Sequence, residues 1–250
     1  MLSIARAAIL SFALIAATGG ANTGANTGAL AGDLSDFNAA VENASAHNRA
    51  AIGYLRTGNT DLAALEIDRL REAWRRLAER FAGQRPDAFD GNPLYGNLWT
   101  AVSARLVAAD FMLKAGRPEA ASSSLNAIRD DLYALRKASG IVVLADCVRD
   151  ANAAMDALTI YHDRALDFAQ PETRFDIASK ASIYGTVLER CDGIAGEGLR
   201  KAPEFRRLVD GAKAGLALIP NAIGTRDGDL LHRLLIDLRS FDDLLALRFG

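Results

Sequence analysis

Apolar residues return at alternating spacings of three and four along almost the whole chain after its first 31 residues. This spacing places them on one face of an α-helix. A half-buried strand would need alternation with a period of two, and no segment of comparable length shows it. Four stripes are especially regular: Ile67, Leu70, Trp74, Leu77, Phe81; Ala121, Leu125, Ile128, Leu132, Leu135; Ile177, Ala181, Tyr184, Leu188, Cys191; and Leu231, Leu234, Leu238, Phe241, Leu245. The pattern predicts an all-α fold of helices packed side by side.

The breaks between these stripes coincide with the prolines. Proline interrupts a helix because it lacks a backbone N–H and clashes with the preceding turn. All six prolines fall between the stripes, and glycine with helix-capping residue types marks two further breaks, at Thr57–Asp61 and Ser139–Gly140. We therefore predict eight helices, at about 35–57, 60–82, 94–115, 118–138, 141–169, 173–199, 203–219 and 227–249. Because most loops are short, consecutive helices are expected to run antiparallel.

The two halves of the chain share short motifs in the same order. Residues 130–136 and 242–248 agree at six of seven positions. Two further matches relate His47-Asn48-Arg49-Ala50 to His162-Asp163-Arg164-Ala165, and Pro93, Tyr95 and Leu98 to Pro203, Phe205 and Leu208. Ordered matches of this kind predict an internal duplication. We expect two tandem antiparallel four-helix units, at 32–139 and 140–250, each an up-and-down bundle.

Two predicted hairpins also share a spacing of small and apolar residues. The first set is Ala51, Tyr54, Gly58, Ala63, Ile67 and Leu70, and the second is Ala109, Gly116, Ala121, Leu125 and Ile128. On these residues the segments 47–82 and 105–138 resemble tetratricopeptide-repeat hairpins, and the resemblance covers only these two hairpins. It implies a peptide-binding groove. The alternative is the pair of tandem bundles, in which small residues at helix crossings explain the same spacing.

The first 31 residues have the features of an export signal. Arg6 supplies a positive start, Ala7–Ala17 is an apolar run too short to span a bilayer, and Ala29-Leu30-Ala31 fits the small-x-small cleavage rule. We expect cleavage before Gly32, with sites back to about Ala21 as alternatives. The segment 1–31 is thus predicted to be a signal peptide. The mature protein is expected to lie in the periplasm of a Gram-negative host and to have no membrane span.

The chain has two cysteines, Cys147 and Cys191, on consecutive predicted helices. They lie about 24 residues before and about 20 residues after the turn near Pro171, so antiparallel helices bring them to nearly the same level. An exported protein meets an oxidising compartment, and we therefore predict a disulfide. The competing interpretation, a metal site shared by Cys147 and His162, would have to span about 22 Å of helix.

Two histidines are candidate ligands. His47 and His162 continue the apolar stripes of their helices, so both are predicted to point inward. One hypothesis makes each a buried ligand for non-covalent haem or a transition metal, as in four-helix cytochromes. The other makes each a core or boundary histidine with a hydrogen-bond partner.

The repeated arginines and acidic pairs are interpreted first as structural residues. Arg49 and Arg164 follow the two histidines, and the alternative for them is an anion site between helices. The acidic pairs Asp130–Asp131 and Asp242–Asp243 lie beside leucine-rich stripes. We interpret each pair as part of a solvated face.

Composition and the absence of familiar motifs narrow the function classes. The chain has 29 basic and 31 acidic residues, a formal net charge of -2, so it lacks the basic excess of a nucleic-acid-binding protein. It contains no HExxH, GxSxG or GxxxxGK sequence. We predict a non-catalytic periplasmic binding or adaptor protein that holds a protein or small-molecule partner in the groove between its units or on a helix face. The alternatives are a haem or transition-metal carrier and, third, a hydrolase or lyase with an unfamiliar site.

Overall fold

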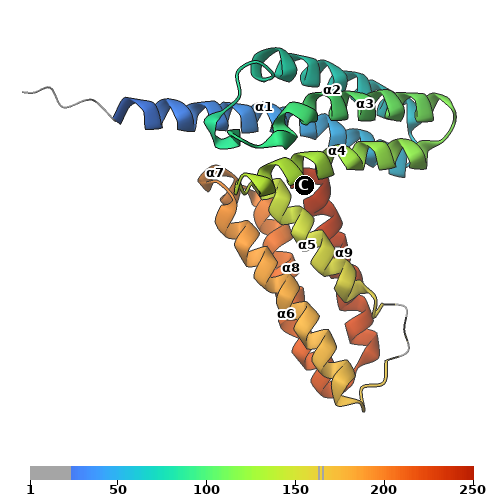
Figure 1. The fold of residues 1–250 in the computed structure, drawn as a ribbon. Coiled ribbons are helices and arrows are strands. Elements are labelled where there is room, and N and C mark those ends of the chain that lie inside the picture. The colour runs from blue at the N-terminus through green and yellow to red at the C-terminus, as the bar shows by residue number, and fades with distance from the viewer. Residues whose placement is uncertain (1–23, 163, 165) are drawn as a thin grey trace, which may run out of the picture.

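The computed structural model describes residues 24–162, 164 and 166–250, and this part of the chain is almost entirely helical, with no strand (Figure 1). The all-α prediction is therefore confirmed. In order, the elements are α1 (Gly24–Arg56), α2 (Thr60–Phe81), the 3-10 helix η1 (Asp87–Phe89), α3 (Pro93–Lys114), α4 (Pro118–Ala138), α5 (Leu144–Thr159), α6 (Pro171–Ile194), α7 (Glu197–Arg200), α8 (Pro203–Thr225) and α9 (Gly228–Phe249).

The first four α-helices form one bundle. α1 packs along α2 and α3 along α4, while contacts of α2 with α3 and of α1 with α4 close the ring. The loop between α2 and α3 seals one end of this bundle, because η1 buries Phe89 completely against the ring of Phe37, with ring centroids 5.1 Å apart. The Tyr95 hydroxyl donates a hydrogen bond to the Phe81 carbonyl oxygen at 2.6 Å and fixes the same end.

The helices α5, α6, α8 and α9 form a second bundle. In it α5 packs along α6 and α8 along α9, and contacts of α5 with α9 and of α6 with α8 close the ring. Gly211 allows α8 and α9 to approach closely, because a Cβ at this position would lie 2.6 Å from the Phe241 ring. Cys147 of α5 and Cys191 of α6 form the predicted disulfide, with their Cα atoms 5.4 Å apart.

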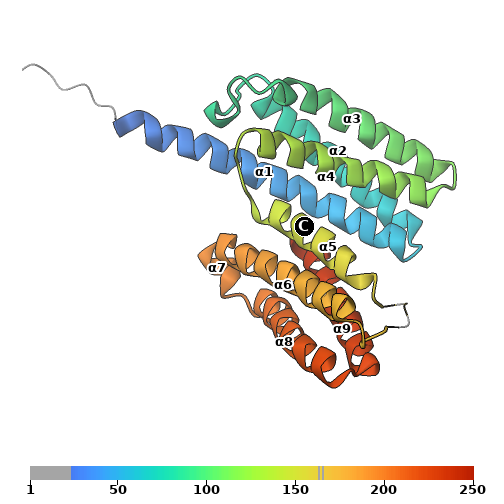
Figure 2. The same cartoon turned by 60° about the horizontal axis from the view of Figure 1, so that its bottom comes forward.

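Each bundle has its own core in the described part of the chain. Buried apolar residues of the first core run from Phe37 to Leu135, and those of the second from Cys147 to Leu245. Figures 1 and 2 show the helices of the second bundle crossing those of the first at a steep angle. We refer to the bundles as the first and second units. Within the described residues, no helix combines the length and the apolar character that a membrane crossing requires.

Four predicted boundaries are wrong. The first helix, predicted from about residue 35, begins at Gly24. The helix predicted at 141–169 ends at Thr159, because Tyr161 and Phe168 of the following loop turn back and are buried in the second core. The helix predicted at 173–199 ends at Ile194, and the short α7 follows after a break at Ala195 and Gly196, within a glycine-rich segment. α8 was expected to end before Pro220 but continues to Thr225. Burial of Ile219 and Ala222 on either side of this proline offsets the lost hydrogen bond.

The repeated seven-residue motif occupies the last helix of each unit, but it does not present the same face. Leu132 is buried on α4, whereas its counterpart Leu244 is 37% exposed on α9. Conversely, Asp130 is exposed and its counterpart Asp242 is completely buried. The identical letters are therefore not structurally equivalent, and the internal duplication stays a prediction. Most of the predicted signal peptide, residues 1–23, lies outside the described residues, and α1 begins at Gly24.

The disulfide should be a major source of stability for the second unit. Replacing Cys147 and Cys191 together by alanine is expected to lower the free energy of unfolding by about 2 to 4 kcal/mol, because the unfolded chain regains the freedom of a long loop. Urea denaturation of the oxidised protein measures this change. Reductant should lower the midpoint of the wild-type protein and leave that of the double variant unchanged. An equal midpoint for the two oxidised proteins would contradict the prediction.

Candidate functional site

The junction between the two units brings the end of α9 against the side of α1 (Figure 1). Arg49 of α1 is buried and donates a hydrogen bond from Nη1 to the Gly250 carbonyl oxygen at 2.9 Å. Gly53, one turn further along α1, leaves room for Leu247, because a Cβ there would lie 3.2 Å from Leu247 Cδ1. The two helices therefore meet through a polar contact beside a close apolar one.

A buried ion pair fixes the other side of the junction. Arg136, near the end of α4, donates from Nε and Nη2 to the two carboxylate oxygens of Asp146 on α5, at 2.7 and 2.5 Å. Both side chains are less than a tenth exposed. A two-point arginine–carboxylate contact defines both the distance and the orientation of its partners. It therefore restrains the first unit against the second.

These contacts leave a hollow of about 280 Å³ between the units, which we call the inter-unit groove. Four helices from both units contribute to it. Its lining residues are Arg49, Ile52, Gly53 and Arg56 of α1, Arg129 of α4, Asn152 and Asp156 of α5, and Arg239, Asp243, Ala246 and Leu247 of α9. A second hollow of about 450 Å³ adjoins it and shares Arg49, Gly53, Arg56 and Leu247.

The positive charge of the inter-unit groove is only partly compensated, since four arginines and two aspartates line it. Arg49 is paired with Glu42 at 2.6 Å, and Arg239 with Asp156 at 2.6 Å. Arg56 and Arg129, by contrast, make no hydrogen bond or ion pair with any residue that the structure describes. The groove thus presents guanidinium donors from α1 and α4 that are not engaged elsewhere.

Of these two arginines, Arg129 is partly buried at the junction, whereas Arg56 is exposed. Burial and the nearby Arg49 guanidinium lower the pKa of Arg129 from its ordinary value. Asp130 opposes this effect, but the same carboxylate is already ion-paired with Arg149 at 2.8 Å. The local environment therefore disfavours the charge of Arg129, and a bound anion would relieve it.

Asp242 lies beneath the groove and is completely buried. It accepts hydrogen bonds from Asn152 Nδ2 at 2.6 Å and from the Tyr184 hydroxyl at 3.3 Å, and Arg239 Nη1 lies 3.5 Å away. Burial raises the pKa of Asp242 to about 6. The interpretation of Asp242 as part of a solvated face is therefore wrong, because Asp242 lies on the side of α9 that packs against the other helices of the second unit. Asn152 and Arg239 connect it to the groove.

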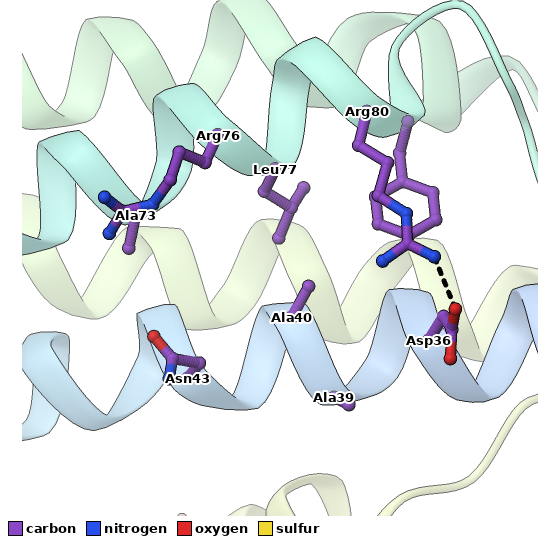
Figure 3. A pocket seen from close by; sticks show the side chains of 9 residues that line it. Asp36, Ala39, Ala40, Asn43, Ala73, Arg76, Leu77 and Arg80 are labelled. Carbon is purple, nitrogen blue, oxygen red and sulfur yellow. Dashed lines mark hydrogen bonds and ion pairs between the residues drawn. The ribbon is translucent and has the colours of Figure 1, made fainter.

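Another candidate hollow lies in the first unit, and both of its arginines are ion-paired, whereas only two of the four arginines in the inter-unit groove have partners among the described residues. It has a volume of about 410 Å³ and lies between α1 and α2 (Figure 3). Figure 3 shows Arg80 reaching across it to an ion pair with Asp36. Its other arginine, Arg76, is paired with Glu72 at 3.0 Å. Since both arginines of this hollow have carboxylate partners, we take the inter-unit groove as the candidate site.

His47 does not point into the bundle as predicted. It is partly exposed, and its Nδ1 lies 2.7 Å from a carboxylate oxygen of Glu66 on α2. Burial raises the pKa of Glu66, but hydrogen bonds with His47 and Arg69 outweigh this and lower it below its usual value. The inward position belongs to the next residue, Asn48, which is buried and donates to the Leu125 carbonyl oxygen at 3.0 Å.

His162 also differs from its predicted position, because α5 ends before it. It lies in the turn after Thr159, partly exposed, and its ring stacks on that of His232 with centroids 4.3 Å apart. Arg164 is exposed in the loop between α5 and α6. The structure therefore brings only one of the four predicted ligand residues, Arg49, to the groove. In the described ranges, no group of three or more His, Cys, Asp or Glu side chains could hold a metal ion.

The sequence carries no signal that marks Arg56, Arg129, Asn152 or Arg239 as site residues. Each lies on a helix with an apolar stripe, but nothing in the local pattern distinguishes these side chains from other polar surface residues. Comparison of the chain with protein-family models, with curated proteins and with solved structures finds no match. The chemistry of the groove is therefore interpreted from its own residues.

The buried carboxylate predicts a stability that depends on pH. Because folding raises the pKa of Asp242 from 3.8 to about 6, its contribution to stability is fully present below about pH 4 and is lost as the pH rises through about 6. The asparagine side chain of the Asp242→Asn variant carries no charge throughout this pH range. At pH 7 it should therefore increase the free energy of unfolding by about 2 to 3 kcal/mol relative to the wild-type protein.

Urea denaturation between pH 4.5 and 7.5 tests this expectation. The matched control is Asp210→Asn, which removes an exposed carboxylate of α8 and should leave the pH dependence of stability unchanged. If Asp242→Asn kept the same pH dependence as the wild-type protein, the assignment of this titration to Asp242 would be wrong.

Proposed function

We propose that this protein is an exported, non-catalytic binding protein that holds a ligand or partner in the inter-unit groove. The observation that carries the proposal is the makeup of the groove. Helices of both units line it, and two of its four arginines have no partner among the described residues. A groove built this way exposes binding groups on a surface that neither unit has alone.

The side chains of the groove favour binding over catalysis. Guanidinium groups stay protonated and donate hydrogen bonds, so they recognise and orient an acceptor without acting as a nucleophile or base. The remaining polar groups are one carboxamide and two carboxylates, beside the apolar side chains of Ile52, Ala246 and Leu247. This combination of a few directed polar groups and apolar contacts is typical of ligand sites.

Export is supported by the amino-terminal sequence and by the disulfide. Structural disulfides persist in oxidising compartments such as the periplasm. Arg6 and the apolar run after it have the composition of a cleaved signal. Together they support a protein that acts outside the cytoplasm.

Expression in a Gram-negative host tests export directly. We expect the protein in the periplasmic fraction, with an amino terminus at Gly32 or at a site back to about Ala21. Peptide sequencing of the purified protein locates this terminus, and alkylation without reduction should leave Cys147 and Cys191 unmodified. Retention of the whole sequence in the cytoplasm would contradict this part of the proposal.

Photo-crosslinking tests the groove. A photoreactive amino acid at Ile52 or Leu247 should give a defined adduct in cells that export the protein. The same amino acid at the exposed apolar positions Ile183 and Leu65, which lie outside the groove, serves as the control and should give none. Equal labelling at all four positions, or no adduct at the groove positions, would count against the proposal. An absorption spectrum with a Soret band, or stoichiometric metal, would replace it with the carrier hypothesis.

A further inference from the structure

We propose, on the basis of this binding function, that the groove recognises an oxyanion, a phosphate or carboxylate group attached to a small apolar portion. Arg129 and Arg56 bind the oxyanion, and Ile52 and Leu247 contact the apolar portion. The first argument is the charge described above. Arg129 is partly buried, faces Arg49, and makes no ion pair or hydrogen bond within the described part of the chain.

The Arg129 side chain lies beside the end of α9. A Cβ built on Gly250 would lie 2.8 Å from Arg129 Nη2, so the guanidinium lies directly beside this residue. Arg49 also contacts this end of α9, and donates from Nη1 to the Gly250 carbonyl oxygen and from Nη2 to Glu42. Partial burial beside Gly250 restricts the conformations open to the Arg129 side chain before a ligand arrives, which lowers the entropic cost of binding.

The rest of the groove limits the ligand. Its volume of about 280 Å³ lies just below the range of about 300 to 1,000 Å³ that is usual for small-molecule sites. Asp156 and Asp243 line the side formed by α5 and α9, so a second negative group on the ligand would meet carboxylates there. Ile52 and Leu247 offer apolar surface instead. These features fit one oxyanion joined to a short apolar chain.

Calorimetric titration with three probes of similar length tests the proposal. Hexyl phosphate and hexanoate carry the two kinds of oxyanion, and hexanol carries none. We expect one or both oxyanion probes to bind the full-length protein with a Kd below about 1 mM. Binding should weaken at high salt, because the contact is between charges. Hexanol should not bind, and the tighter of the two anions identifies the preferred group.

Substitutions of single arginines locate the binding. Arg129→Gln should weaken binding of the preferred probe by about tenfold or more, as expected for loss of a charge-assisted hydrogen bond. Arg117→Gln removes the same charge from an exposed position at the start of α4, outside the groove, and should leave the affinity unchanged. If Arg129→Gln does not fold, the exposed Arg56→Gln provides the same test and should also weaken binding.

The outcomes separate this inference from the proposed function. If neither oxyanion probe binds, or if Arg129→Gln and Arg56→Gln bind as the wild-type protein does, the inference is wrong. The charge of Arg129 then needs no compensation beyond that of Asp130. Groove-specific crosslinking together with such a result would keep the binding function and exclude oxyanion recognition. Failure of both experiments would overturn both proposals.

Discussion

The buried ion pair between Arg136 and Asp146 restrains the two units relative to each other. It lies where the chain passes from one bundle to the next, and both charged groups are removed from water. Removing one partner of such a pair costs about 3 to 5 kcal/mol, because the other charge stays buried without compensation. Together with the hydrogen bond from Arg49 to Gly250, this ion pair connects α5 and α9 to the first unit.

The inter-unit groove is a consequence of that arrangement. Arg129 would be a surface arginine on α4 in an isolated first unit, and Arg239 would be a surface arginine on α9 in an isolated second one. The junction places them in one hollow with Arg49 and Arg56. Arg49 is paired with Glu42 of its own helix and Arg239 with Asp156 of the groove, while the charge of Arg129 is left in an unfavourable environment. Proteins tend to retain energetically unfavourable local arrangements, such as a poorly compensated charge, at sites of function.

The second unit positions several residues of the inter-unit groove. Asn152 and Asp156 project from α5, whose neighbour α6 is tied to it by the disulfide. Asp242 holds Asn152 from the interior and lies near Arg239, so one buried carboxylate orients two residues of the groove. The pKa of about 6 follows from the same burial. Stability and the shape of the site are therefore coupled in the second unit.

The sequence by itself determined the helices and the disulfide. Helical stripes depend on a local repeat, and the level of Cys147 relative to Cys191 depends only on helix rise and one turn. Only the tertiary structure decided that α5 ends at Thr159, that Pro220 lies within α8, and that Asp242 is buried although Asp130, at the matching place in the repeated motif, is exposed. The inter-unit groove is also a feature that only the tertiary structure decided. Its arginines come from α1, α4 and α9, and their proximity depends on how two bundles pack together, a long-range relation that no local pattern of residues encodes.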